Sequence, residues 1–182
     1  MSDFLDPNYE VPQKAGNYMR FDEDENKFRI LDKPIMGYEY WITNKDGSRK
    51  PVRKQMNEDI PVEELEGDEI PKHFWAMPVY NYQEEKIQIL EITQKSILKS
   101  IRALERSKDW GSPLNYDIIV FKTGQKLETR YNVQPAPPKP LSKALLDDYK
   151  DMGIDLEQLF TGGDPFGKDK FIDEVSEKIK EV

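Results

Sequence analysis

Two strands and a helix are predicted by residues 73–107, which read HFWAMPVYNYQEEKIQILEITQKSILKSIRALERS. Residues 73–82 and 86–93 are rich in aromatic and β-branched side chains and flank a short polar connector, so they predict a β-hairpin. Apolar residues then recur at helical spacing, which predicts an amphipathic helix over 94–107 with Thr93 as its N-cap. The change from one pattern to the other indicates a sheet interrupted by a single helix.

Further strands are predicted on both sides of this stretch. The segments that carry the strand pattern are 28–31 and 37–43, which form one strand with a break near Pro34, then 49–54, 115–124 and 126–135. About five strands with one interposed helix fit a five-stranded oligonucleotide-binding (OB) barrel better than a sandwich. Parallel α/β folds are disfavoured because strands and helices do not alternate. We therefore expect a mainly β protein.

The chain divides into four parts by composition. Residues 1–16 are polar and aperiodic, which predicts a flexible arm, and 17–135 form the OB domain. Four prolines within 135–140 indicate a stiff linker over 136–141. Residues 142–182 are acidic and predict a tail with short helices, the first of them capped by Ser142.

Composition excludes most covalent and metal chemistry. The chain has 182 residues, a net charge of −8, no cysteine and one histidine, His73. Disulfides, thiolate zinc sites, a cysteine nucleophile, a His-rich metal site and a Ser-His-Asp triad are therefore not expected, and neither is a cofactor. No apolar run is long enough to span a membrane, and the N-terminus lacks the features of a signal peptide, so we expect a cytoplasmic protein.

Charge is distributed unevenly along the chain. Residues 27–54 hold eight bases against three acids, whereas 55–70 hold seven acids and neither Lys nor Arg. A solvated surface is the ordinary explanation of such blocks. The crowding of aromatic residues in and near the basic segment favours a binding site instead, because bases stack on aromatic rings while Lys and Arg contact phosphates.

Strand periodicity divides the aromatic residues between two faces. The more apolar set is expected to point inward: Trp41, Trp75, Met77 and Val79. The predicted site for single-stranded nucleic acid lies on the outside and comprises Tyr38, Tyr40, Phe74, Tyr80 and Tyr82, with Lys45, Arg49, Lys50, Arg53 and Lys54. Secondary candidates are Lys72, Arg130, Arg20, Lys27, Arg29 and Lys33.

At these residues the sequence resembles the single-stranded DNA-binding proteins of tailed bacteriophages. The motifs are GYEYW (37–41) followed by a basic segment, then HFWAMPVYNYQEEKIQILEITQKSI (73–97) and DWGSPLNYDIIVFKTGQKLETRYNVQP (109–135). The resemblance implies an OB barrel that binds single-stranded DNA with little sequence preference, in phage DNA replication, recombination and repair in the host cytoplasm. It also implies an acidic C-terminal tail that recruits polymerase, helicase or primase. The structural zinc of one branch of the family is not expected here, because the chain has no cysteine.

Two alternatives remain open. The acidic clusters 22–25 and 63–64 could hold a metal for a nuclease, although contiguous acids on loops are more typical of solvated surface. The aromatic patch could also bind RNA or another protein. His73 is expected at a strand end or on the surface rather than as a catalytic base, and the oligomeric state is left open.

Overall fold

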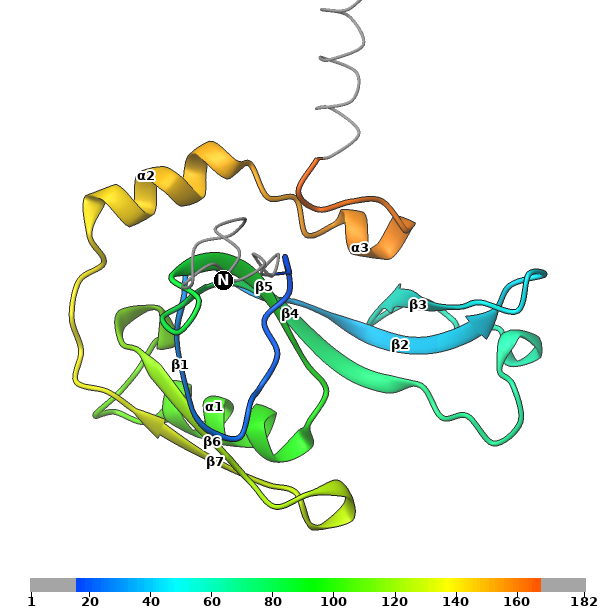
Figure 1. Cartoon of the computed structure of the whole chain (residues 1–182), viewed down its shortest axis with the longest axis horizontal. Helices are drawn as coiled ribbons and strands as arrows, with labels where there is room; N and C mark the ends of the chain where they lie inside the picture. Colours follow the sequence, from blue (N-terminus) through cyan, green and yellow to red (C-terminus); the bar gives the residue numbers. More distant parts are fainter. Residues whose placement is uncertain (1–15, 168–182) are drawn as a thin grey trace, which may run out of the picture.

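The structure is a computed structural model that describes residues 16–167 (Figure 1). Within that range the strands are β1 (Asp24–Ile30), β2 (Ile35–Thr43), β3 (Arg49–Gln55), β4 (Lys72–Asn81), β5 (Lys86–Ile92), β6 (Ile118–Thr123) and β7 (Arg130–Pro135). The helices are α1 (Lys95–Arg106), α2 (Lys143–Met152) and α3 (Gln158–Thr161), with short 3-10 turns η1 (Val62–Glu64), η2 (Pro113–Asn115) and η3 (Lys126–Glu128). Residues 1–15 of the predicted arm and residues 168–182 of the predicted tail lie outside the described residues.

All the strands belong to one antiparallel sheet. Its order is β3-β2-β4-β1-β6-β7, and β5 pairs with the other edge of β4. β1 and β2 pair in succession with the same edge of β4: Ile30 lies opposite Val79 and, after the break, Ile35 lies opposite Ala76. The predicted break near Pro34 is therefore confirmed. Beyond it, β2 and β3 leave the curled body of the protein and form an extended arm (Figure 1).

The main hydrophobic core lies inside the curl of the sheet, with α1 across one side. Its buried side chains include Phe28, Ile30, Met77, Val79, Leu90, Ile92, Ile97, Leu98, Ile101, Ile118 and Val120. The three from α1 follow the predicted helical spacing. α1 also contacts β7. β5, which precedes α1, and β7 share no hydrogen-bonded pairing in the described part of the chain.

The predicted fold class is confirmed in its coarse form, a mainly β protein with one helix between strands. The predicted five-stranded barrel is not confirmed, because residues 16–167 contain seven strands and the sheet does not close. The prediction of Thr93 as the N-cap is wrong: Gln94 holds that position, without a capping side-chain hydrogen bond. Ser142 does cap α2, since its Oγ accepts a hydrogen bond from the Leu145 N–H at 3.2 Å.

A second apolar cluster lies on the outer face of the sheet, the face opposite the main core. Phe74, Ala76 and Ile89 are fully buried there. They are covered by the segment that follows α2, which passes over the sheet in Figure 1. The covering side chains are Ile154, Leu156, Leu159, Phe160 and Phe166. Residues 153–166, part of the predicted tail, therefore pack against the sheet.

Gly37 lies where the arm meets the ring of Phe160 from the covering segment. A β-carbon at this position would lie 2.2 Å from the Lys54 carbonyl oxygen and 3.1 Å from the rings of Phe74 and Phe160. Real β-carbons do not approach a backbone oxygen so closely. Glycine is therefore required where β2, β3 and the covering segment meet.

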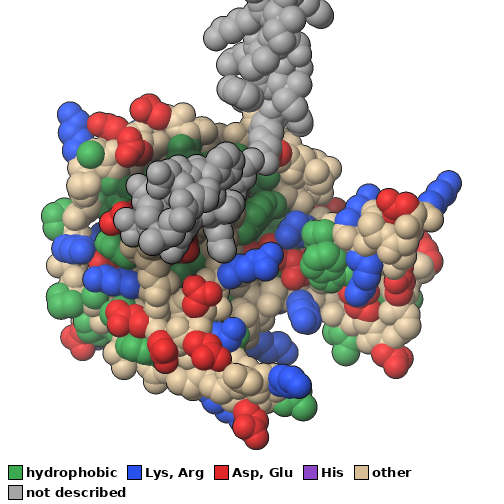
Figure 2. Space-filling view, viewed as in Figure 1, with side chains coloured by type: hydrophobic (Ala, Val, Ile, Leu, Met, Phe, Trp, Pro, Cys, Tyr) green, Lys and Arg blue, Asp and Glu red, His purple; other side chains and the backbone are tan. Residues whose placement is uncertain are grey.

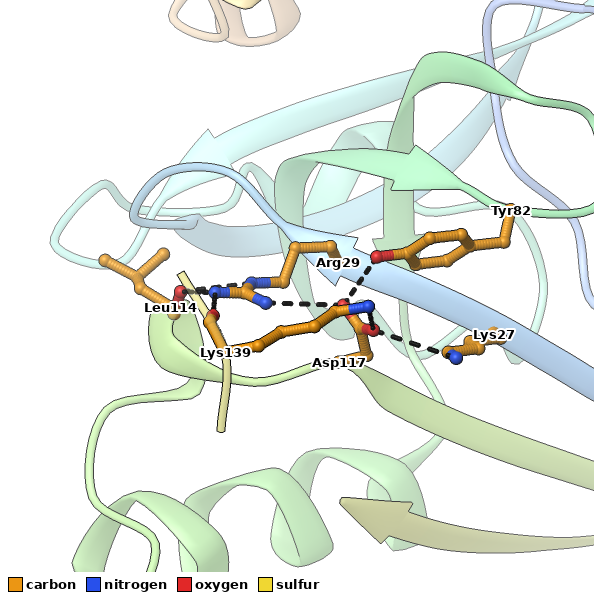
Figure 3. A network of polar contacts seen from close by, with 6 residues as sticks. All are labelled: Lys27, Arg29, Tyr82, Leu114, Asp117 and Lys139. Carbon is orange, nitrogen blue, oxygen red and sulfur yellow. Dashed lines mark hydrogen bonds and ion pairs between the residues drawn. The ribbon is translucent and has the colours of Figure 1, made fainter. Parts of the chain in front are cut away.

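A buried ionic network attaches the proline-rich segment to the sheet (Figure 3). The Arg29 guanidinium, 1% exposed, lies 3.4 Å from Oδ1 of Asp117, which is equally buried. Arg29 also donates to the carbonyls of Leu114 and Lys139, the latter at 2.7 Å. The Lys139 ammonium lies 3.0 Å from Asp117 Oδ2. The predicted linker is extended, but it is held along the domain by these contacts; the division into separate domains stays a prediction.

Candidate nucleic-acid interface

The two faces of the arm differ in chemistry. Directly paired residues of antiparallel strands point to the same side of a sheet. On the side that continues the main core, Met36 pairs with Trp75, and Tyr38 pairs with both His73 and Lys54. We call this side of β2, β3 and the start of β4 the inner face of the arm. Its residues are Met36, Tyr38, Tyr40, Ile42, Lys50, Val52, Lys54, His73 and Trp75.

An open cavity of about 590 Å³ lies where the inner face meets α1. We call it the inner groove. Met36, His73 and Trp75 line it from the sheet, while Lys33 comes from the loop before β2 and Arg102 from α1. It therefore combines an apolar floor, contributed by Met36 and Trp75, with two cations, Lys33 and Arg102, and two carboxylates, Asp32 and Glu105.

The aromatic side chains of the groove are held in place by local contacts. His73 Nδ1 lies 2.8 Å from the carbonyl oxygen of Gly37, so it donates a hydrogen bond there. The Tyr38 and His73 rings are 5.5 Å apart at 54°. Trp75 is half-buried against the main core, and Met36 is 40% exposed. Such partly exposed flat surfaces beside cations suit the stacking of unpaired bases.

The predicted site residues separate into groups. Tyr38, Lys50 and Lys54 share the inner face with the groove. Arg49, Arg53 and Lys72 lie on the outer face of the arm, since they pair with Thr43 and Glu39. Lys45 lies in the exposed turn at the end of the arm, and the exposed Arg130 donates to the carbonyls of Leu127 and Thr129. Arg29, a secondary candidate, is buried in the ionic network.

The predicted division of β4 into two faces is confirmed by its strand pairing, but the predicted orientation of β2 is wrong. Met77 and Val79 point into the main core as predicted. Trp41, predicted inside, lies on the outer face of the arm and is 41% exposed. Tyr40, predicted outside, is 1% exposed, because the loop between β3 and β4 covers it and Glu64 accepts a hydrogen bond from its hydroxyl.

The prediction that Phe74 is exposed is also wrong. Phe74 does lie on the outer face of the sheet, opposite the main core, but it is fully buried by the segment after α2. Its ring packs 6.2 Å from that of Phe160, so it contributes to the second apolar cluster. No free ring surface of Phe74 is available for stacking in this structure.

Tyr80 and Tyr82 lie on the outer face near the ionic network. Their rings meet edge to face at 5.1 Å, and the Tyr82 hydroxyl donates to Asp117 Oδ1 at 2.8 Å (Figure 3). Burial and this hydrogen bond raise the pKa of Tyr82. The ammonium groups of Lys27 and Lys139 lie 5.0 Å and 5.4 Å from the Tyr82 ring centre. These tyrosines are thus separated from the inner groove by the thickness of the sheet.

Sequence reasoning missed the residues that give the groove its shape. Trp75, predicted inside, is only half-buried at the edge of the core. Met36 is absent from the predicted site, and so is Arg102, because the basic helix 94–107 is predicted only to close the barrel. The signal for Arg102 is its position directly after the buried Ile101 at the rim of α1. Figure 2 shows Lys and Arg side chains gathered along the notch between the arm and the body of the protein.

Arg53 lies between two carboxylates on the outer face. Its Nη2 is 2.7 Å from Glu91 Oε2, and its Nε is 3.6 Å from Glu39 Oε2. Burial, followed by the hydrogen bond and repulsion from Glu91, raises the pKa of Glu39 from 4.5 to about 8. At neutral pH the Glu39 carboxyl group is therefore mostly protonated, and Arg53 pairs with Glu91, so this predicted DNA contact is engaged internally.

The Glu39 carboxyl group is expected to make stability depend on pH. Because its pKa is higher in the folded state, about 8, than its ordinary value of 4.5, the folded state binds more protons between these values and stability falls as pH rises through them. After allowance for solvent screening, we expect a loss of about 1–2 kcal/mol between pH 5 and 9. Glu39→Gln should abolish this loss in urea denaturation, whereas the exposed control Glu84→Gln should keep it. An unchanged pH slope in Glu39→Gln would contradict the assignment.

The alternative of a metal-dependent nuclease receives no support from the acidic clusters. Within residues 16–167 no group of three or more His, Cys, Asp or Glu side chains is arranged to hold a metal ion. The same residues contain no helix with the length and apolar character needed to cross a bilayer.

The sequence is similar to one curated phage protein. Over 140 residues it is 27% identical to a "Probable ssDNA-binding protein" of Escherichia phage T5, which covers 64% of this chain. The predicted resemblance to a phage single-stranded DNA-binding protein is confirmed. The aligned region spans 54%, about half, of the length of that relative. No protein-family model and no solved structure matches the chain.

Proposed function

We propose that this protein binds single-stranded DNA with little sequence preference, and that the strand lies in the inner groove. The main observation behind the proposal is that a half-buried Trp75 and an exposed Met36 face an open cavity lined by the cations Lys33 and Arg102, beside the carboxylates of Asp32 and Glu105. The name of the phage T5 relative supports the same ligand. Each stacked base contributes roughly 1–3 kcal/mol, and this contribution is similar for all four bases.

The groove favours an unpaired strand over a duplex for a geometric reason. The apolar floor formed by Met36 and Trp75 is recessed between the sheet and α1, so a base must leave its stack to reach it. The cations Lys33 and Arg102 line the groove, and Lys54 lies opposite Tyr38 on the inner face of the arm, where they can follow the phosphates of a strand whose bases point inward. In a duplex the faces of the bases are covered by their neighbours.

The strand arrangement supports an OB-type barrel as the scaffold. Five strands pair in the order β5-β4-β1-β6-β7, and α1 connects β5 to β6. OB folds are partly open five-stranded Greek-key barrels that bind single strands and oligosaccharides on one face and its loops. On this interpretation the arm of β2 and β3 is an insertion between the first two barrel strands.

The proposed site is tested by changing its charges. The variant Lys33→Gln, Lys54→Gln, Arg102→Gln is expected to bind an oligo-dT strand at least about tenfold more weakly, and the slope of log affinity against log salt should fall by about 2. The matched control Lys95→Gln, Lys99→Gln, Lys108→Gln removes the same charge from exposed positions outside the groove. Fluorescence anisotropy measures both. Equal losses in the two variants would show that the groove is not the site.

A role in phage replication, recombination and repair, with recruitment of polymerase, helicase or primase by the C-terminal region, is part of the same proposal. Of the net −4 in residues 136–182, all but one charge lies in 136–167, which the structure describes. Residues 168–182 are nearly balanced in charge. Because 168–182 hold little net charge, deleting them should leave DNA affinity within about twofold. The same deletion is expected to abolish capture of a phage replication enzyme, since the proposal assigns recruitment to this end of the tail. Retained capture would contradict recruitment by this segment.

A further inference from the structure

The loop between β3 and β4, which we call the acidic loop (residues 56–71), makes an unusual set of contacts with the arm. It holds seven carboxylates and neither Lys nor Arg. Three of these carboxylates accept hydrogen bonds from β2: Glu64 from the Tyr40 hydroxyl, Glu66 from the Thr43 N–H at 2.8 Å and hydroxyl at 2.9 Å, and Glu69 from the Trp41 N–H at 2.8 Å. The loop therefore attaches to the arm through its charged groups.

These donors lie on a part of β2 that lacks a neighbouring strand on one side. The pairing of β2 with β4 ends at Glu39 and Lys72, while β2 continues to Thr43. Its backbone N–H groups at 41 and 43 would otherwise face water. The carboxylates of Glu66 and Glu69 thus take the place of the carbonyl groups that a neighbouring strand would supply.

Much of the apolar surface of the acidic loop does not contribute to its attachment. Val62 and Ile70 are 76% and 79% exposed, and Met56 is 51% exposed. Glu64 and Glu66 are themselves exposed, so their hydrogen bonds compete with water. Exposed contacts of this kind are individually weak, typically below about 1 kcal/mol. The loop is therefore held on the arm by contacts that another anion can replace.

The donors that hold the acidic loop are those that proteins use to bind phosphate. Backbone N–H groups, hydroxyl groups and guanidinium groups all donate to nucleic-acid phosphates. Beside Trp41 and Thr43, Arg49 places its Nη2 3.8 Å from Glu69 Oε2. Carboxylate and phosphate oxygens accept hydrogen bonds from the same donors. At the same time, the loop keeps Tyr40 buried, although Tyr38, two residues earlier on the same face, is partly open.

We propose that the acidic loop occupies the phosphate-binding donors of the arm around Tyr40, Trp41 and Thr43. A bound single strand then displaces the loop from these donors and uncovers Tyr40. This inference rests on the proposed binding of single-stranded DNA in the inner groove. Displacement lengthens the binding surface from the groove along the arm and adds one aromatic ring. The loop thereby lowers the affinity of the free protein for short or weakly bound strands.

Two variants with the same change in charge distinguish the effect of the hydrogen bonds between the acidic loop and β2 from the effect of the loop's negative charge. The contact variant is Glu64→Gln, Glu66→Gln, Glu69→Gln. The control variant, Asp59→Asn, Glu63→Gln, Asp68→Asn, neutralises three carboxylates of the same loop for which no hydrogen bond to β2 is present in the structure. At low salt the contact variant is expected to bind an oligo-dT strand about tenfold more tightly than the control. The difference should shrink at high salt.

The outcomes distinguish this inference from the proposed function. Equal affinities of the contact and control variants, with clear binding by the wild type, would overturn the role of the loop and leave the proposed function intact. Failure of all three proteins to bind single-stranded DNA would overturn both. Should the contact variant not fold, Tyr40→Phe removes only the hydroxyl that donates to Glu64, and it is expected to bind about twofold more tightly than wild type; unchanged affinity would then overturn the inference.

Discussion

Replacing Asp117 with alanine is expected to lower the free energy of unfolding by about 3–5 kcal/mol. The carboxylate is 1% exposed and lies within ion-pair distance of Arg29, Lys139 and Lys27, while Tyr82 donates a hydrogen bond to it. Its removal leaves the buried guanidinium of Arg29 without a counter-ion in a site of low dielectric constant. Both the interior of the sheet and the attachment of the proline-rich segment are then weakened.

Urea denaturation followed by circular dichroism measures this loss. Asp109→Ala is the matched control, because Asp109 is exposed and its change should cost less than about 0.5 kcal/mol. A loss below about 1 kcal/mol for Asp117→Ala would mean that the network in Figure 3 does not hold the segment to the sheet.

Phe74→Ala is the second change with a large expected effect, again a loss of about 3–5 kcal/mol in the free energy of unfolding. The ring is fully buried between the sheet and the segment after α2, and it contacts the ring of Phe160. Truncation leaves a cavity in the small second cluster, which has few other side chains with which to fill it. The cover formed by residues 153–166 should loosen, which hydrogen exchange would detect.

An exposed aromatic residue of the arm provides the contrast. Trp41→Ala, on the same outer face but 41% exposed, should cost less than about 1 kcal/mol. If Phe74→Ala left the stability unchanged but strongly lowered the affinity for single strands, Phe74 would be a DNA contact rather than part of the second apolar cluster.

Local patterns were sufficient for the hairpin of β4 and β5 and for α1. Their apolar residues point to one continuous core, so period two and period 3.6 are visible in the sequence. The arm is different, because both of its faces are partly covered. The acidic loop buries Tyr40 on one face, and the segment after α2 packs on Gly37 from the other. The alternation of apolar and polar residues along β2 then does not distinguish the buried face from the exposed one. The predicted faces of Tyr40 and Trp41 are therefore the reverse of those in the structure.

The candidate site was only partly predictable for a related reason. Contacts between residues far apart in the sequence decide which cations are free: Arg29 pairs with Asp117, and Arg53 pairs with Glu91. Neither pairing leaves a local signature. The groove itself needs α1 to approach the start of β4, which brings Arg102 close to Trp75. The sequence was sufficient to predict a site made of aromatic rings and cations. Which of these residues lie together in the groove is decided by contacts between distant parts of the chain.

A titration of the full chain can show whether the inner groove holds an unpaired strand. The affinity for an oligo-dT strand of about 20 nucleotides is compared with that for the matching duplex and for oligo-U at low and high salt, with tryptophan quenching as the readout, since Trp75 lines the groove. We expect the DNA single strand to bind at least about tenfold more tightly than the duplex at both salt concentrations, with quenching. Equal affinity for duplex and single strand, or a clear preference for RNA, or the absence of binding, would contradict it.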